Sequence, residues 1–176
     1  MRKQIILLIL IVLLVGCKVE NELIEPLQIQ DYKDVLPGAD QFEIAIPEGW
    51  RDVQLLPNTY LYHPPSKNPE SPPMESVSVK IIPSTEDELI EDLVNQEIEA
   101  NKKEIVGLEI IEQSHEKNKA SLKAKSVYQG MGIEMSQIFI KFSDRTFITT
   151  YLCPENSCNH YSEFEMIANS VNPLIK

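Results

Sequence analysis

The residues best placed to do chemistry are two cysteines near the C-terminus and a histidine that follows them. Cys153 and Cys158 enclose Pro-Glu-Asn-Ser, and His160 comes two residues later. In an oxidising compartment this spacing favours a disulfide that closes a small loop. The C-x₄-C-x-H pattern also offers three ligands to zinc, but a closed zinc site uses four, and no further Cys or His lies nearby. We therefore expect a Cys153–Cys158 disulfide and no metal, with a metal site or two free thiols as alternatives.

A third cysteine, Cys17, ends an apolar segment at the start of the chain. Two basic residues precede the apolar run 5–15, which is the layout of an export signal. The run is shorter than the about 20 apolar residues that a transmembrane helix needs. Its last residues, Leu-Val-Gly-Cys17, resemble the lipobox of lipoproteins, in which the cysteine receives a diacylglyceryl group and the signal is cut before it. We expect a signal peptide at 1–16 and lipid on Cys17; a short uncleaved signal anchor is the alternative.

The charge of the chain excludes two classes of partner. It has 16 basic and 27 acidic residues, a net charge of −11, and loss of the two basic signal residues makes the mature chain −13. Nucleic acid and anionic lipid headgroups both require a basic face. The mature length and a hydrophobic content of 43% suit one domain with a real core. We expect membrane attachment through the lipid alone, and no nucleic-acid partner.

Catalytic motifs are missing from the sequence. It has no G-x-S-x-G, P-loop, H-E-x-x-H or G-x-G-x-x-G pattern. His115 precedes a glutamate but has no partner histidine at Lys119, and a solvated position beside a turn is expected for it. A hydrolase would need a serine, a histidine and a carboxylate brought together by the fold. We expect no enzymatic activity, no catalytic residue and no cofactor.

Prolines gather in one segment, since six of the twelve lie between residues 57 and 73. Proline cannot donate a ladder hydrogen bond, so this segment is expected to be an exposed loop. Such loops often carry function. The candidate binding loop consists of Tyr60, Tyr62, His63, Pro64 and Pro65. An inert insertion is the alternative, and Trp50, at the corner after Pro47, is expected to pack in the core rather than on a binding edge.

The elements that position these residues follow from the spacing of apolar side chains. Alternation predicts strands, which are expected at 42–46, 59–63, 77–81, 108–114, 120–128, 133–142 and 145–152. Thr85 to Glu88 forms a capping-box pattern, and helical spacing follows it as far as Ile105, before Gly107. A second amphipathic helix is expected from Tyr161 to Val171. Residues 17–40 are acidic and are expected to form a flexible tether, with an added strand or helix as the alternative.

This order of elements resembles the PsbP/DcrB-like fold over roughly residues 41 to 174. The landmarks are FEIAIPEGW at 42–50, VSVKIIP at 77–83, the long helix, a four-strand meander and the closing helix with Phe164, Ile167 and Ser170. The resemblance implies an α+β domain at 41–176, with an antiparallel sheet of about six strands flanked by the two helices. Several proteins of this fold are small extracytoplasmic lipoproteins, and most lack enzymatic activity.

The sequence therefore predicts a non-catalytic lipoprotein at the extracytoplasmic face of the cell membrane, or at the outer membrane if the source is Gram-negative. It is expected to act as an accessory or protein-binding module with a protein partner that the sequence does not identify. A lipoprotein that binds a small solute or a metal ion is the alternative.

Overall fold

The computed structural model describes residues 42–56, 58–66 and 74–173, apart from the side chains of 53–56. The predicted signal, Cys17, the tether and loop residues 67–73 lie outside the described residues. Within that part of the chain, no helix is long and apolar enough to cross a membrane. The elements are β1 (Phe42–Glu43), β2 (Arg51–Leu56), β3 (Thr59–His63), β4 (Ser76–Pro83), α2 (Ile90–Glu104), β5 (Glu109–His115), β6 (Lys119–Tyr128), β7 (Met131–Lys141), β8 (Arg145–Pro154), α3 (Tyr161–Ser170) and β9 (Asn172–Pro173).

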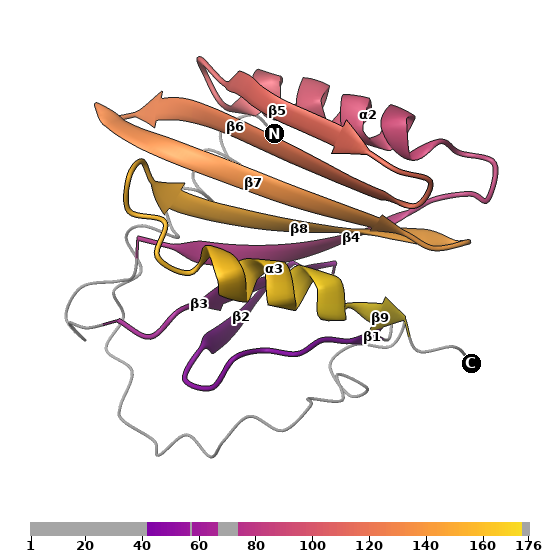
Figure 1. Ribbon diagram of the computed structural model, residues 1–176, viewed down its shortest axis with the longest axis horizontal. Helices are drawn as coiled ribbons and strands as arrows, with labels where there is room; N and C mark the ends of the chain where they lie inside the picture. Colours follow the sequence, from indigo (N-terminus) through magenta and orange to yellow (C-terminus); the bar gives the residue numbers. More distant parts are fainter. Residues whose placement is uncertain (1–41, 57, 67–73, 174–176) are drawn as a thin grey trace.

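One antiparallel sheet of seven strands, in the order β2-β3-β4-β8-β7-β6-β5, forms the body of the fold (Figure 1). Strands β5 to β8 are a meander, as their short connections predicted. The β6–β7 hairpin turns over Gln129 and Gly130, whose φ values of 51° and 82° suit a two-residue type I′ turn. Because β8 pairs with β4, Ser76 at the start of β4 lies opposite Leu152 near the end of β8.

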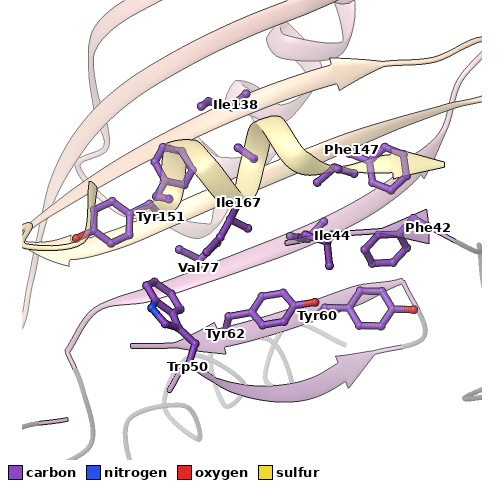
Figure 2. Close-up of a cluster of buried hydrophobic side chains, with 14 of the residues drawn as sticks. Phe42, Ile44, Trp50, Tyr60, Tyr62, Val77, Ile138, Phe147, Tyr151 and Ile167 are labelled. Carbon is purple, nitrogen blue, oxygen red and sulfur yellow. The ribbon is translucent and has the colours of Figure 1, made fainter. Parts of the chain in front are cut away.

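The two helices pack on opposite faces of the sheet (Figure 1). Helix α2 places Val94 and Ile98 against Leu122, Phe139 and other buried residues of β6, β7 and β8. Helix α3 covers the other face over β3, β4 and β8, where the larger cluster of buried side chains lies (Figure 2). Each buried aliphatic or aromatic side chain contributes about 1.5–3 kcal/mol. The predicted α+β architecture with an antiparallel sheet and two helices is therefore confirmed.

Two strands differ from the prediction, and the sheet has seven strands rather than about six. Of the predicted strand 42–46, only Phe42 and Glu43 form β1, which pairs with β9 in a separate two-stranded sheet. The Ala45 N–H donates instead to Ser170 Oγ at 2.8 Å, so this backbone turns to the end of α3. No strand was expected at 51–56, yet these residues form the edge strand β2 because β3 supplies its ladder.

Helix α2 begins at Ile90, later than the capping box predicted. Its N-cap is Leu89, with no side-chain hydrogen bond at the cap. Half of the box forms, because the Thr85 N–H donates to Glu88 Oε2 at 3.4 Å. The Glu88 N–H donates to the Thr85 carbonyl at 3.2 Å, so these residues close a turn of their own before the helix. Gly107, with a φ of 74°, follows the helix as predicted.

Val94 in α2 and Val106, two residues after its end, test how much of the stability comes from the α2 face. Val94 is 0% exposed and Val106 is 89% exposed. We expect Val94→Ala to lower the free energy of unfolding by about 2 kcal/mol, from lost burial plus a cavity. Val106→Ala should change it by less than about 0.5 kcal/mol. Urea unfolding followed by Trp50 fluorescence measures both, and equal losses would contradict this packing.

Candidate functional site

A buried carboxylate is the centre of the candidate site. Glu75 lies directly before β4 and is 8% exposed. It accepts hydrogen bonds from the Asn159 N–H at 3.1 Å and Nδ2 at 2.9 Å, and from the His160 N–H at 3.2 Å and Nδ1 at 2.9 Å. The Tyr151 hydroxyl donates a fifth. Glu75 therefore joins β4 to β8 and to the loop before α3.

A disulfide fixes the loop that supplies most of these donors. Cys153 on β8 and Cys158 in the loop are bonded, as the sequence predicted. Asn156, between them, has a φ of 66°, the left-handed conformation that asparagine tolerates in a tight turn. Because Cys158 directly precedes Asn159, the bond holds the donor segment at a set distance from the end of β8.

The base of the proline-rich loop also contacts Glu75, at its backbone carbonyl. His63 Nδ1 lies 3.4 Å from the Glu75 carbonyl oxygen. Trp50 is buried, as expected, and its ring meets the His160 ring edge-on with centroids 5.7 Å apart. Burial lowers the pKa of His63, and the positive charge of Arg51 lowers it further against the opposing effect of the carbonyl. His63 is thus a neutral side chain at pH 7.

The network also shifts the pKa values of two of its own groups, Glu75 and Tyr151. Burial alone would raise the pKa of Glu75, but the hydrogen bonds from Tyr151, Asn159 and His160 outweigh it and lower that pKa below its ordinary value. Burial, together with the Glu75 carboxylate, raises the pKa of Tyr151, so its hydroxyl remains a donor. At neutral pH the site therefore holds one buried anion surrounded by donors.

The candidate binding loop is only partly on the surface. Tyr60 and Tyr62 belong to the buried cluster, where Figure 2 shows their rings among the side chains of the core. They alternate with Leu61 on β3 and so both face α3, as strand geometry requires. Pro64 is also buried, His63 is half-buried, and Pro65 is exposed. The expected surface role is therefore wrong for Tyr60, Tyr62 and Pro64, which build the core beneath the loop.

The hydrogen bonds around Glu75 are those of a buried anion held in place by its neighbours. His160 and Glu75 form two-thirds of a hydrolase triad, but in the described part of the chain no serine hydroxyl hydrogen-bonds to His160. The acceptor positions of Glu75 are taken by five internal donors, which leaves little capacity for a substrate. His160, named from the sequence only in the alternative metal site, has its Nδ1 on the carboxylate and is not among the metal-ligand residues that lie together near the cysteines in the described part of the chain.

We name the region around this network the Glu75 end of the sheet. There β3, β6 and β8 end, β4 and β7 begin, and α3 starts. Five of the eight exposed large apolar side chains in the described part of the chain lie at this end: Met74, Val106, Val127, Met131 and Leu152. Singly exposed apolar residues are ordinary, whereas larger apolar patches are typical of interaction sites.

Comparison with known proteins places the fold and no more. No protein-family model and no curated protein matches the chain. Among solved structures it is similar to PA94, a Pseudomonas aeruginosa protein of unknown function, with a TM-score of 0.54, 18% identity, and coverage of 84% of this chain and 99% of that one. It is also similar to LpqN of Mycobacterium tuberculosis, described as involved in cell envelope biogenesis, with a TM-score of 0.56, 12% identity, and coverage of 83% and 91%.

A third structure, from Bacteroides thetaiotaomicron, gives a TM-score of 0.48 and 12% identity over 77% of this chain. This chain spans 46% of that protein, which is therefore much longer. At these identities, the PA94 and LpqN structures show only that this chain shares their fold over most of their length. They assign no residue of the site.

Sequence reasoning did not identify Glu75 or Asn159 as members of a site. Glu75 ends a proline-rich segment, and its donors lie 84 and 85 positions later in the chain. No local spacing links such residues, because the pairing of β4 with β8 is what brings them together. The one sequence signal for order in the loop before α3 was Cys158, next to Asn159, because a disulfide was expected there.

Glu75 gives the fold a defined dependence on pH. Because folding lowers its pKa, the ionised carboxylate stabilises the fold above its unfolded value of about 4.3, and this contribution is lost as pH falls through the folded pKa. We expect Glu75→Gln to lower the free energy of unfolding by about 2 kcal/mol at pH 7. The loss should shrink between about pH 5 and pH 3.

Glu48→Gln is the matched control, since Glu48 is exposed in the nearby turn. Urea unfolding at several pH values, read from Trp50, the single tryptophan, gives both losses. The same loss at pH 3 as at pH 7, or a loss no larger than that of the control, would contradict the role given to Glu75.

Proposed function

We propose that this chain is a lipid-anchored, non-catalytic accessory protein of the extracytoplasmic face that binds another envelope protein through the Glu75 end of its sheet. We assign it to the PsbP/DcrB-like fold on the order of its strand, turn and helix signals. The lipid on Cys17 holds the domain at the membrane, and residues 17–40 set its distance from the surface.

The location is supported by two features of different kinds. The segment before Cys17 has the layout of a lipoprotein signal. The disulfide between Cys153 and Cys158 is a bond that persists in oxidising compartments outside the cytoplasm. LpqN, a structural neighbour, is described as involved in cell envelope biogenesis. That description concerns LpqN, but an envelope role for this chain agrees with it.

The five exposed apolar side chains at the Glu75 end carry the proposal of a protein partner. Burial of Met and Leu side chains of this kind drives protein–protein association. The Glu75 network and the disulfide tie the nearby loop to the sheet, so less conformational entropy is lost on binding. With the carboxylate already satisfied internally, the site favours recognition over catalysis.

Cys17→Ser tests the anchor. In cells given a labelled fatty acid, we expect the unaltered chain to carry the label and to sediment with membranes, because two or more acyl chains hold a protein firmly at a bilayer. Cys17→Ser should lose the label and keep the uncleaved signal. Cys158→Ser, which removes a different cysteine, should stay labelled. Unchanged labelling of Cys17→Ser would overturn the lipid anchor.

Site-specific photo-crosslinking tests the binding surface. Met74 is 53% exposed at the Glu75 end, and Leu89 is 64% exposed before α2, at the opposite end of the sheet. With a photoreactive residue at position 74 in native membranes, we expect a discrete crosslinked protein, because a specific partner covers that surface. The same residue at position 89 should give none. Equal products from both positions, or none from position 74, would contradict a partner at this end.

A further inference from the structure

A carboxylate lies beside the two bonded sulfurs. Glu134 on β7 is the register partner of Cys153 on β8. Its Oε2 lies 3.7 Å from Cys158 Sγ, and its carbonyl oxygen lies 3.8 Å from Cys153 Sγ. One carboxylate oxygen and both sulfur atoms fall within 4.8 Å of one another. Three groups that bind soft or borderline divalent metals in proteins thus converge on one point.

The disulfide itself gives no reason for this carboxylate to be there. A sulfur in a disulfide has no hydrogen to donate, so neither contact to Glu134 is a hydrogen bond in the oxidised form. In the described part of the chain Glu134 also forms no ion pair. Glu134 stands opposite Lys125 of β6 in the register, and toward β8 its carboxylate lies where it could act as a ligand once the sulfurs are reduced.

We propose that reduction of the Cys153–Cys158 disulfide opens a binding site for a thiophilic divalent cation such as Zn²⁺, ligated by both sulfurs and by the Glu134 carboxylate. A dithiol reductant supplies two electrons and two protons, breaks the S–S bond to give two thiols, and becomes a disulfide itself. The cation then displaces both thiol protons and binds two thiolates. The oxidised and metal-bound forms exclude each other, because they use the same sulfurs.

The geometry suits such an ion. Zinc–sulfur bonds of about 2.3 Å and zinc–oxygen bonds of about 2.0–2.2 Å place the two ligand atoms roughly 3.5 Å apart at a tetrahedral angle. The 3.7 Å between Glu134 Oε2 and Cys158 Sγ is close to this spacing. With the Cα atoms of the two cysteines 5.2 Å apart, side-chain rotation can separate the sulfurs while the strands stay paired.

The ligand set differs from the one that the C-x₄-C-x-H pattern suggested. His160 Nδ1 is held by Glu75, and the third ligand comes from the neighbouring strand instead. Three protein ligands leave a fourth position for water or for a group of another molecule, as in zinc sites that bind or exchange a ligand. Cys158 is only partly buried, so a reductant and an ion can reach it. This site gives the metal-binding alternative a definite place in the fold.

The experiment uses the full chain in detergent, with Co²⁺ as a spectroscopic probe. After reduction and anaerobic removal of the reductant, we expect one equivalent of Co²⁺ to give thiolate-to-metal charge-transfer absorption, which Zn²⁺ then removes. The oxidised chain should give none. Glu134→Gln should weaken binding about tenfold or more, because loss of a group that merely supports a ligand already costs roughly 10–100-fold. Glu155→Gln, an exposed carboxylate inside the disulfide loop, should leave affinity unchanged.

Two further variants keep the result unambiguous. Cys153→Ser/Cys158→Ser retains Cys17, so absorption that persists in it would assign the metal to Cys17 and overturn the proposal. His160→Gln removes one donor to Glu75, so its readout is the spectrum and not the affinity: bound Co²⁺ should absorb at the same wavelengths as in the unaltered reduced chain, and shifted bands would show that the ligand set is wrong. Trp50 fluorescence checks that each variant is folded. No absorption in the reduced unaltered chain, or full affinity in Glu134→Gln, would also overturn the site.

Discussion

The buried carboxylate of Glu75 is the constraint on which one end of the molecule depends. An ionised group removed from water costs many kcal/mol unless it is paired and hydrogen-bonded. Here the compensation comes from Tyr151, Asn159 and His160, which are far from Glu75 in the chain. The start of β4, the end of β8 and the loop before α3 must therefore all be in place before the charge is tolerated. Such an all-or-none requirement favours one arrangement of these segments over near alternatives.

The disulfide and the Glu75 network support each other because they share a short stretch of chain. Cys158 is bonded to the end of β8, and the next two residues donate to the carboxylate. The bond limits the conformations that this loop can adopt when unfolded, and the network fixes its direction when folded. Trp50 packs against the His160 ring of this network, and His63, at the base of the proline-rich loop, contacts the Glu75 carbonyl. Order at this end thus comes from a polar centre, whereas α2 is held by its apolar cluster together with the polar contacts of Glu97 with Lys80 and of Asn101 with Gln137.

The sequence predicted those parts of the fold whose signals are local. Helical spacing and Gly107 gave α2, and clear alternation with short turns gave the meander β5 to β8. It did not predict β2, because the alternation in RDVQLL is limited to Asp52 through Leu55, and this short segment is completed as a strand by its pairing with β3. Tyr60 and Tyr62 were expected on a surface because prolines follow them, but the periodicity of their own strand buries both. Glu75 could not be found, since its partners are set by tertiary pairing alone.

The proposed metal site and the proposed binding surface are connected through β7 and β8. Glu134 follows Met131 on β7, and Cys153 follows Leu152 on β8, so ligands and exposed apolar side chains alternate along the same strand ends. Neighbouring residues of a strand point to opposite faces. The sulfurs therefore lie on the α3 side, with the Glu75 network, while Leu152 faces the α2 side. A change at the sulfurs would act on Asn159 and His160 through the loop, and on Leu152 along β8, because Leu152 directly precedes Cys153.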